Sequence, residues 1–116
     1  MKKITPEQLD KNWEQLTAEL SQTLGRKPDL QGILFLIGVQ ELGQLHRKFS
    51  KEEKQYLMHI AVCQLLCPDG YFVFKHRDED GWPHYEAIKP MPHDANNLPA
   101  QEELLKYAVL RYLERI

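Results

Sequence analysis

Apolar side chains recur every three or four residues through the first 25 positions, as they do along one face of a helix. They are Leu9, Trp13, Leu16, Leu20 and Leu24. Thr5 and Gln8 form a capping-box pattern at the start of this segment. Pro6 suits the first helical position and Gly25 is a typical stop. The pattern predicts an amphipathic helix that lies on a core.

The next segment, from residue 29 to about residue 49, is strongly apolar. The run Ile33–Val39 alone fits a buried strand as well as a helix. Because the apolar pattern continues through Leu42 and Leu45, over about five turns, its length favours a helix. Apolar nearly all round, this should be the central helix of the fold. Close packing against neighbouring elements is the simplest reason for its three glycines, Gly32, Gly38 and Gly43.

Two more helices are predicted. Ser50 and Glu53 form a capping box at the start of the third, and Pro68 and Gly70 end it. Its apolar surface comprises Tyr56, Leu57, Ile60, Ala61, Val62, Cys63, Leu65 and Leu66. The last helix begins at Pro99, after an irregular loop over residues 90–98. Its apolar residues are Leu104, Leu105, Ala108, Val109, Tyr112, Leu113 and Ile116.

Residues 71–77 and 82–89 predict two strands of a β-hairpin. Gly81 suits the left-handed bulge position of a three-residue loop, which pairs Asp78 with Trp82. The same register pairs His76 with His84, Phe74 with Glu86, and Phe72 with Ile88. Because side chains alternate between faces, one face is expected to pack on the helices through Phe72, Phe74, Trp82 and Ile88. The opposite face would present Lys75, Arg77 and Tyr85.

This order of elements, ααα-ββ-α, indicates a mostly helical α+β fold. The 116 residues are the size of one domain, and no linker or repeat divides them, so residues 1–116 are expected to form a single domain. A tight turn near Phe49 and Ser50 would make the second and third helices a central αα-hairpin. The antiparallel β-hairpin would pack on it.

Two stretches carry a resemblance to known proteins: GILFLIGVQELG over residues 32–43 and KQYLMHIAVC over residues 54–63. Together with Gly70-Tyr71 and DGWPH over residues 80–84, they resemble a family of small bacterial proteins of unknown function. The resemblance covers most of the chain beyond the first helix. It implies one intact domain and no particular activity.

Composition narrows the classes of partner. The formal net charge is -2 and the pI about 6.2, which argues against nucleic acid and against an anionic membrane surface. The longest apolar run is far shorter than the ~20 residues of a membrane span. The polar N-terminus lacks the apolar stretch of a signal peptide. Two cysteines, Cys63 and Cys67, fit reduced thiols, so the cytoplasm is the expected location.

Catalytic motifs are missing from the sequence: it has no P-loop, dinucleotide fingerprint, nucleophile elbow or HExxH. Glu41 and His59 are the more informative pair. They lie at similar distances from the predicted turn between their helices, so a partly buried hydrogen bond between them is expected. A structural lock between the helices is the favoured interpretation. A catalytic acid–base pair and two groups that never meet are the alternatives.

Other candidate ligands have plain explanations. His59, Cys63 and Cys67 share one helix face and are zinc-ligand types, but a buried cysteine more often acts as a small hydrophobe. The cross-strand pair His76 and His84 would suit a metal or a pH sensor, but a partly solvated pair at the end of the sheet is the favoured interpretation. The acidic turn at residues 78–81 is expected to be solvated. No metal and no cofactor are predicted.

Two function hypotheses remain. The first is a small protein-interaction module that binds a protein partner or a second copy, because a two-stranded sheet has two open edges. Arg77 and Tyr85, placed on the outward face, are its leading contact residues. The alternative is a small ligand-binding protein or enzyme with a pocket near Glu41, His59 and the hairpin histidines His76 and His84.

Overall fold

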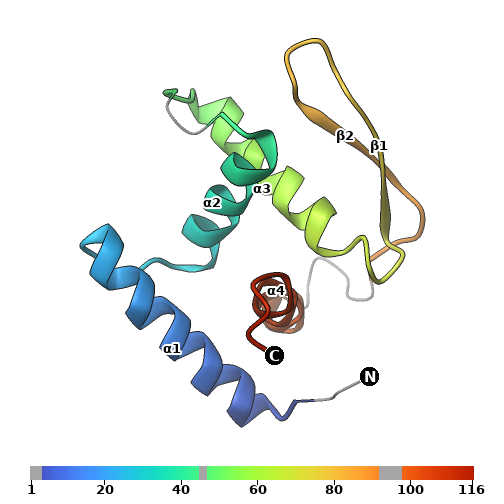
Figure 1. Cartoon of the computed structure of the whole chain (residues 1–116). Coiled ribbons are helices and arrows are strands. Elements are labelled where there is room, and N and C mark those ends of the chain that lie inside the picture. The colour runs from blue at the N-terminus through green and yellow to red at the C-terminus, as the bar shows by residue number, and fades with distance from the viewer. Residues whose placement is uncertain (1–3, 45–46, 92–97) are drawn as a thin grey trace.

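The computed structural model describes residues 4–44, 47–91 and 98–116 and has the predicted order of elements (Figure 1). The elements are α1 (Pro6–Leu24), α2 (Leu30–Leu42), α3 (Lys51–Leu65), β1 (Phe72–Arg77), β2 (Pro83–Ala87) and α4 (Leu98–Tyr112). The α+β fold is therefore confirmed. Most of the irregular loop predicted over residues 90–98 lies outside the described residues, as does Leu45 of the predicted second helix.

The predicted starts of α1 and α3 are confirmed by their caps. Thr5 accepts a hydrogen bond from the Gln8 backbone N–H at 3.1 Å, and the Gln8 side chain accepts one from the Thr5 N–H. Ser50 and Glu53 form the same reciprocal pair at the start of α3. Such caps satisfy backbone N–H groups that have no partner within the helix.

The C-terminal end of α2 differs from the prediction. The helix stops at Leu42, about two turns before residue 49, because Gly43 adopts a left-handed conformation with φ of 81°. Its N–H donates to Val39 O at 3.0 Å. Gly43 is thus a helix cap and does not lie inside the helix.

Gly38 lets α2 and α3 approach each other closely. A Cβ atom at this position would lie 2.1 Å from the carbonyl oxygen of Leu57, far inside contact distance. Any larger residue would push the two helices apart. The predicted central αα-hairpin and the role of a glycine in its packing are both confirmed.

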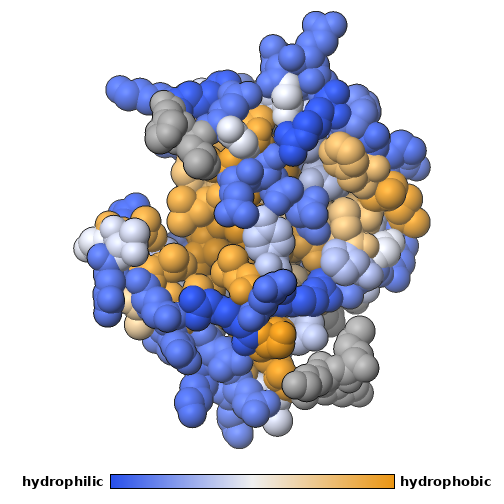
Figure 2. Space-filling model, viewed as in Figure 1, coloured by the Kyte–Doolittle hydropathy of each residue, from blue (hydrophilic) through white to orange (hydrophobic). Residues whose placement is uncertain are grey.

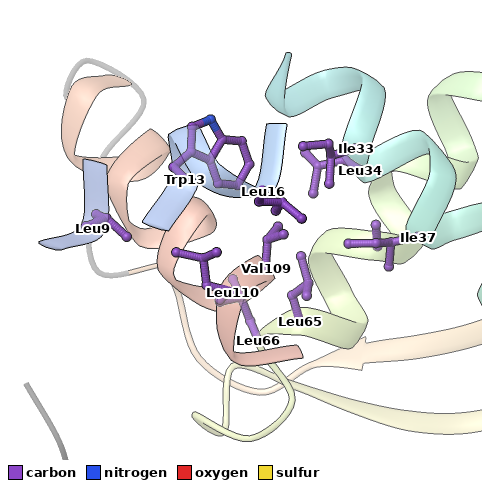
Figure 3. Close-up of a cluster of buried hydrophobic side chains, with 12 residues drawn as sticks. Leu9, Trp13, Leu16, Ile33, Leu34, Ile37, Leu65, Leu66, Val109 and Leu110 are labelled. Carbon is purple, nitrogen blue, oxygen red and sulfur yellow. The ribbon is translucent and has the colours of Figure 1, made fainter. Parts of the chain in front are cut away.

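All four helices contribute to the main hydrophobic core (Figure 3). Ten of its buried side chains are Leu9, Trp13, Leu16, Ile33, Leu34, Ile37, Leu65, Leu66, Val109 and Leu110. A smaller cluster continues toward the hairpin and combines Val39, Leu42, Leu57 and Ile60 with Phe35, Phe49, Trp82 and Tyr85. The hairpin therefore lies beside the core and packs on one side of α3 (Figure 1).

The hairpin register matches the prediction near the turn and departs from it further out. The Asp78 N–H donates to Trp82 O at 3.0 Å, and His76 pairs with His84, both as expected. Beyond an irregularity at Lys75, the pairs are Phe74 with Tyr85 and Phe72 with Ala87. The predicted pairs Phe74–Glu86 and Phe72–Ile88 are wrong, because an extra residue in one strand shifts the register by one.

That shift changes which residues face the helices. Phe72 and Trp82 contact the core clusters as predicted. Phe74 and Ile88, both predicted to pack on the helices, are 47% and 57% exposed. Arg77 and Tyr85, predicted to face outward, instead direct their polar groups toward α2 and α3. A one-residue slip moves side chains to the opposite face, which accounts for the errors.

No helix within the described ranges has the length and apolar character needed to cross a membrane.

Candidate functional site

The inner side of the hairpin meets α2, α3 and α4 at a polar junction, which we call the hairpin junction. It contains Gln40, Glu41, Gln64, Arg77, Tyr85 and Tyr112. Arg77 anchors the turn, with Nη1 donating to Gly81 O at 2.8 Å and Nη2 to Glu41 O at 2.6 Å. Glu41 O belongs to the last turn of α2, whose carbonyls have no partner within the helix. Arg77 therefore caps α2 from the hairpin.

Two tyrosine hydroxyls complete the hairpin junction. Tyr85 Oη donates to Gln64 Oε1 at 2.7 Å, joining β2 to α3. Tyr112 Oη donates to Glu41 Oε2 at 2.5 Å, joining α4 to α2, and accepts from Gln40 Nε2 at 3.2 Å. These bonds satisfy the polar groups of partly buried side chains, which would otherwise oppose folding.

Three groups at or near the hairpin junction, the hydroxyls of Tyr85 and Tyr112 and the thiol of Cys63, are held in their protonated forms. Burial, followed by the nearby Glu41 carboxylate, raises the pKa values of both Tyr85 and Tyr112. Burial also raises the pKa of the Cys63 thiol to about 11. An activated nucleophile or base needs the opposite shift, so the tyrosines are suited to donating structural hydrogen bonds.

The predicted pair of Glu41 and His59 does not form. The Glu41 carboxylate is bonded to Tyr112, whereas His59 is exposed and its Nε2 contacts Cys63 Sγ at 3.5 Å. The reason is the early end of α2. Since Gly38 lies against Leu57, Glu41 is level with a position on α3 about one turn before His59.

The thiol of Cys63 in α3 and that of Cys67, just after this helix, also have local partners. Cys67 Sγ donates to Cys63 O at 3.2 Å, and Cys63 is almost fully buried. In residues 4–44, 47–91 and 98–116, no three His, Cys, Asp or Glu side chains are placed to hold a metal ion. His59 and Cys63 lie on α3, whereas Cys67 follows its end, so the predicted shared helix face does not extend to Cys67.

The two hairpin histidines meet on the outer side of the sheet. Their rings stack with centroids 4.9 Å apart and planes 11° from parallel, while His84 Nε2 lies 2.9 Å from Asp78 Oδ2. The other oxygen of Asp78 accepts the N–H groups of Asp80 and Trp82, each at 3.0 Å. The hydrogen bond with His84, then that with Trp82, lowers the pKa of Asp78. The acidic turn was predicted to be merely solvated, but Asp78 organises it.

Sequence reasoning missed most of the hairpin junction's partners. Tyr112 was assigned to the apolar face of the last helix, and Gln64 was not singled out. A tyrosine on a mainly apolar face is itself a signal, because its hydroxyl needs a polar partner when it is buried. Which partner it finds depends on tertiary contacts between residues 71 positions apart.

Five surface pockets among the described residues are lined by side chains other than Glu41 and His59. They measure about 280 to 500 Å³, and the largest of the five lies between the start of α2 and α4. A catalytic or ligand site at Glu41 and His59 would need convergent groups in a concave pocket. The observed geometry gives that alternative no support.

The hairpin's outer face is the side turned away from the helices: Val73, Lys75, His76, His84, Glu86 and Ile88. Val73 is 41% exposed and Ile88 57% exposed. Glu86, opposite Val73, forms an exposed ion pair in which Lys75 Nζ is 3.2 Å from Glu86 Oε2. Hydrophobic atoms are visible over the hairpin in Figure 2, with a second group over α2. No element among the described residues covers this face.

Comparisons of the chain with protein-family models, with curated proteins and with solved structures give no match. A function is therefore inferred from the residues of the chain and their geometry.

Proposed function

We propose that the protein is a small protein-interaction module and that the hairpin's outer face is its docking surface. The observation that carries this proposal is the exposure of Val73 and Ile88 on an uncovered two-stranded sheet. The inner side of the hairpin already bonds to the helices through Arg77 and Tyr85. Those two side chains position the hairpin, and the outer face supplies the contacts to the partner.

The size of the surface favours a short segment of another protein over a second copy of this chain. Strands of six and five residues present an area on the order of 200 Å². A stable interface buries roughly 800 Å² on each partner. An extended segment that pairs with a strand edge gains backbone hydrogen bonds in addition to side-chain contacts, so it can bind with a small area.

The free thiols indicate the cellular compartment in which the protein binds its partner. Cys63 and Cys67 are not paired in a disulfide. Unpaired cysteines fit a reducing compartment, and we therefore assign the interaction to the cytoplasm.

The test compares partner capture by three tagged proteins in the cells that make this chain: the wild type, Val73→Thr/Ile88→Ser, and Leu24→Ser. Leu24 is 44% exposed on α1 and supplies a matched loss of apolar surface away from the hairpin. We expect at least one protein to be enriched with the wild type and with Leu24→Ser but lost with the double variant. Equal capture by all three would overturn the proposal. Sedimentation of the purified wild type reports whether a second copy is the partner instead.

A further inference from the structure

An open surface pocket of about 370 Å³ lies beside the hairpin turn and combines aromatic rings with carboxylates. Its lining residues are Glu52, Glu53, Tyr56 and Trp82. The rings of Tyr56 and Trp82 have centroids 5.5 Å apart and planes at 58°, so they form two tilted walls. Glu52 and Glu53 lie in the first turn of α3. Aromatic faces and carboxylates both attract cations.

One half of this surface already holds a cation from the same chain. The guanidinium of Arg47 lies 5.0 Å from the ring centroid of Phe49 and 5.7 Å from that of Trp82. It also forms an ion pair with Glu53. This surface therefore already binds one guanidinium group between aromatic rings and an acidic side chain.

The other half has the same chemistry without a cation of its own. Tyr56 is 38% exposed, and no lysine or arginine of the described chain lies over its ring, although the His59 ring is 6.2 Å from it. Among the described residues, Glu52 has no hydrogen-bond or ion-pair partner. Asp78 adds negative charge nearby. Burial is the main cause of the raised pKa of Tyr56, and the charge of Asp78 is the next. Glu52 and Tyr56 thus repeat the carboxylate–aromatic arrangement that Glu53 and its rings offer to Arg47.

We propose that the pocket formed by Glu52, Tyr56 and Trp82 binds an arginine side chain of the partner protein. This inference rests on the proposed function and names a feature of the partner. A planar guanidinium can stack on a ring while it donates to a carboxylate, which suits this geometry better than a compact ammonium group. The open shape admits a side chain that approaches along the surface from a partner on the neighbouring hairpin.

The probe is acetyl-glycyl-arginyl-glycinamide, titrated into the isotope-labelled protein and followed by NMR. The chain has two tryptophans, so the indole N–H of Trp82 reports on the pocket and that of Trp13, in the core, is an internal control. We expect saturable shifts at Trp82, weakened by salt, and no shift at Trp13. The matching lysyl peptide should bind more weakly, and the glutamyl and leucyl peptides should cause no comparable shift.

Two variants remove the same charge at different places. Glu52→Gln should weaken binding of the arginyl peptide about two- to fivefold, as expected for one exposed ion pair. Glu79→Gln, in the exposed hairpin turn, should leave it unchanged. Equal weakening by both variants, equal binding of the lysyl or leucyl peptide, or no shift at Trp82 would each overturn the proposal. This titration does not involve Val73 or Ile88. A negative result here can therefore be distinguished from a negative result in the capture experiment.

Discussion

The helical core and the hairpin are held in place by different kinds of contact. In the core, side chains such as Leu16, Leu65 and Leu110 are nearly inaccessible to water and belong to one cluster of buried apolar residues. The hairpin is fixed mainly by the hydrogen bonds of Arg77 and Tyr85 and by aromatic contacts of Trp82. Burial of apolar area supplies most of a domain's stability, while a single hydrogen bond adds little. Changes in the core should therefore cost more than changes at the hairpin.

The largest expected effect comes from the closest helix contact. Gly38→Ala should reduce the free energy of unfolding by about 3 kcal/mol or more, because the new methyl group would meet the Leu57 carbonyl at 2.1 Å. Gly32→Ala on the same helix is the control. Its methyl group would meet two side chains and no backbone, Asp29 at 3.3 Å and Pro28 at 3.7 Å, and alanine favours the helix. Urea denaturation measures both, and similar stabilities for the two variants would contradict the packing described for α2 and α3.

A cavity in the core should cost nearly as much. Leu110→Ala removes a fully buried side chain, and we expect a loss of about 2–5 kcal/mol. Leu113→Ala, on the exposed side after α4, should cost much less. Thermal and urea unfolding of the pair would test this. A small effect at Leu110 would show that α4 contributes little to the core.

The hairpin junction should show a smaller effect. Tyr112→Phe removes the hydroxyl that donates to Glu41 and is expected to cost about 1–2 kcal/mol. Tyr56→Phe removes a hydroxyl that has no bonded partner among the described residues and should be close to neutral. Equilibrium denaturation distinguishes the two, and equal effects would mean that the bond to Glu41 contributes nothing.

The smallest effect concerns the hairpin turn. His84→Ala should raise the pKa of Asp78 toward its ordinary value, because the hydrogen bond from His84 is the main cause of its lowering. In the wild type, the Asp78 carboxylate contributes to stability above its ordinary pKa, and this contribution is lost as the pH falls through the lowered value. NMR titration of the carboxyl carbon measures the shift. The neighbouring Asp80→Asn variant should leave the Asp78 titration nearly unchanged.

The same contrast explains how far sequence reasoning reached. The caps at Thr5 and Ser50, the element order and the helical core follow from short-range signals that the structure confirms. The bulge at Lys75 carries no such signal, because any residue can occupy it, and it changed which hairpin residues face inward. The bond between Glu41 and Tyr112 joins distant parts of the chain and depends on where α2 ends. Patterns therefore predicted the core well and the hairpin junction poorly.

Photo-cross-linking tests most directly whether the outer face of the hairpin is the docking surface. A benzoylphenylalanine residue is placed at position 88 in one protein and at position 24 in another, both of which are exposed sites. On irradiation in the cells that make the protein, we expect a discrete adduct from position 88 and none from position 24. An adduct from position 24 alone, or from neither position, would contradict a partner on the hairpin.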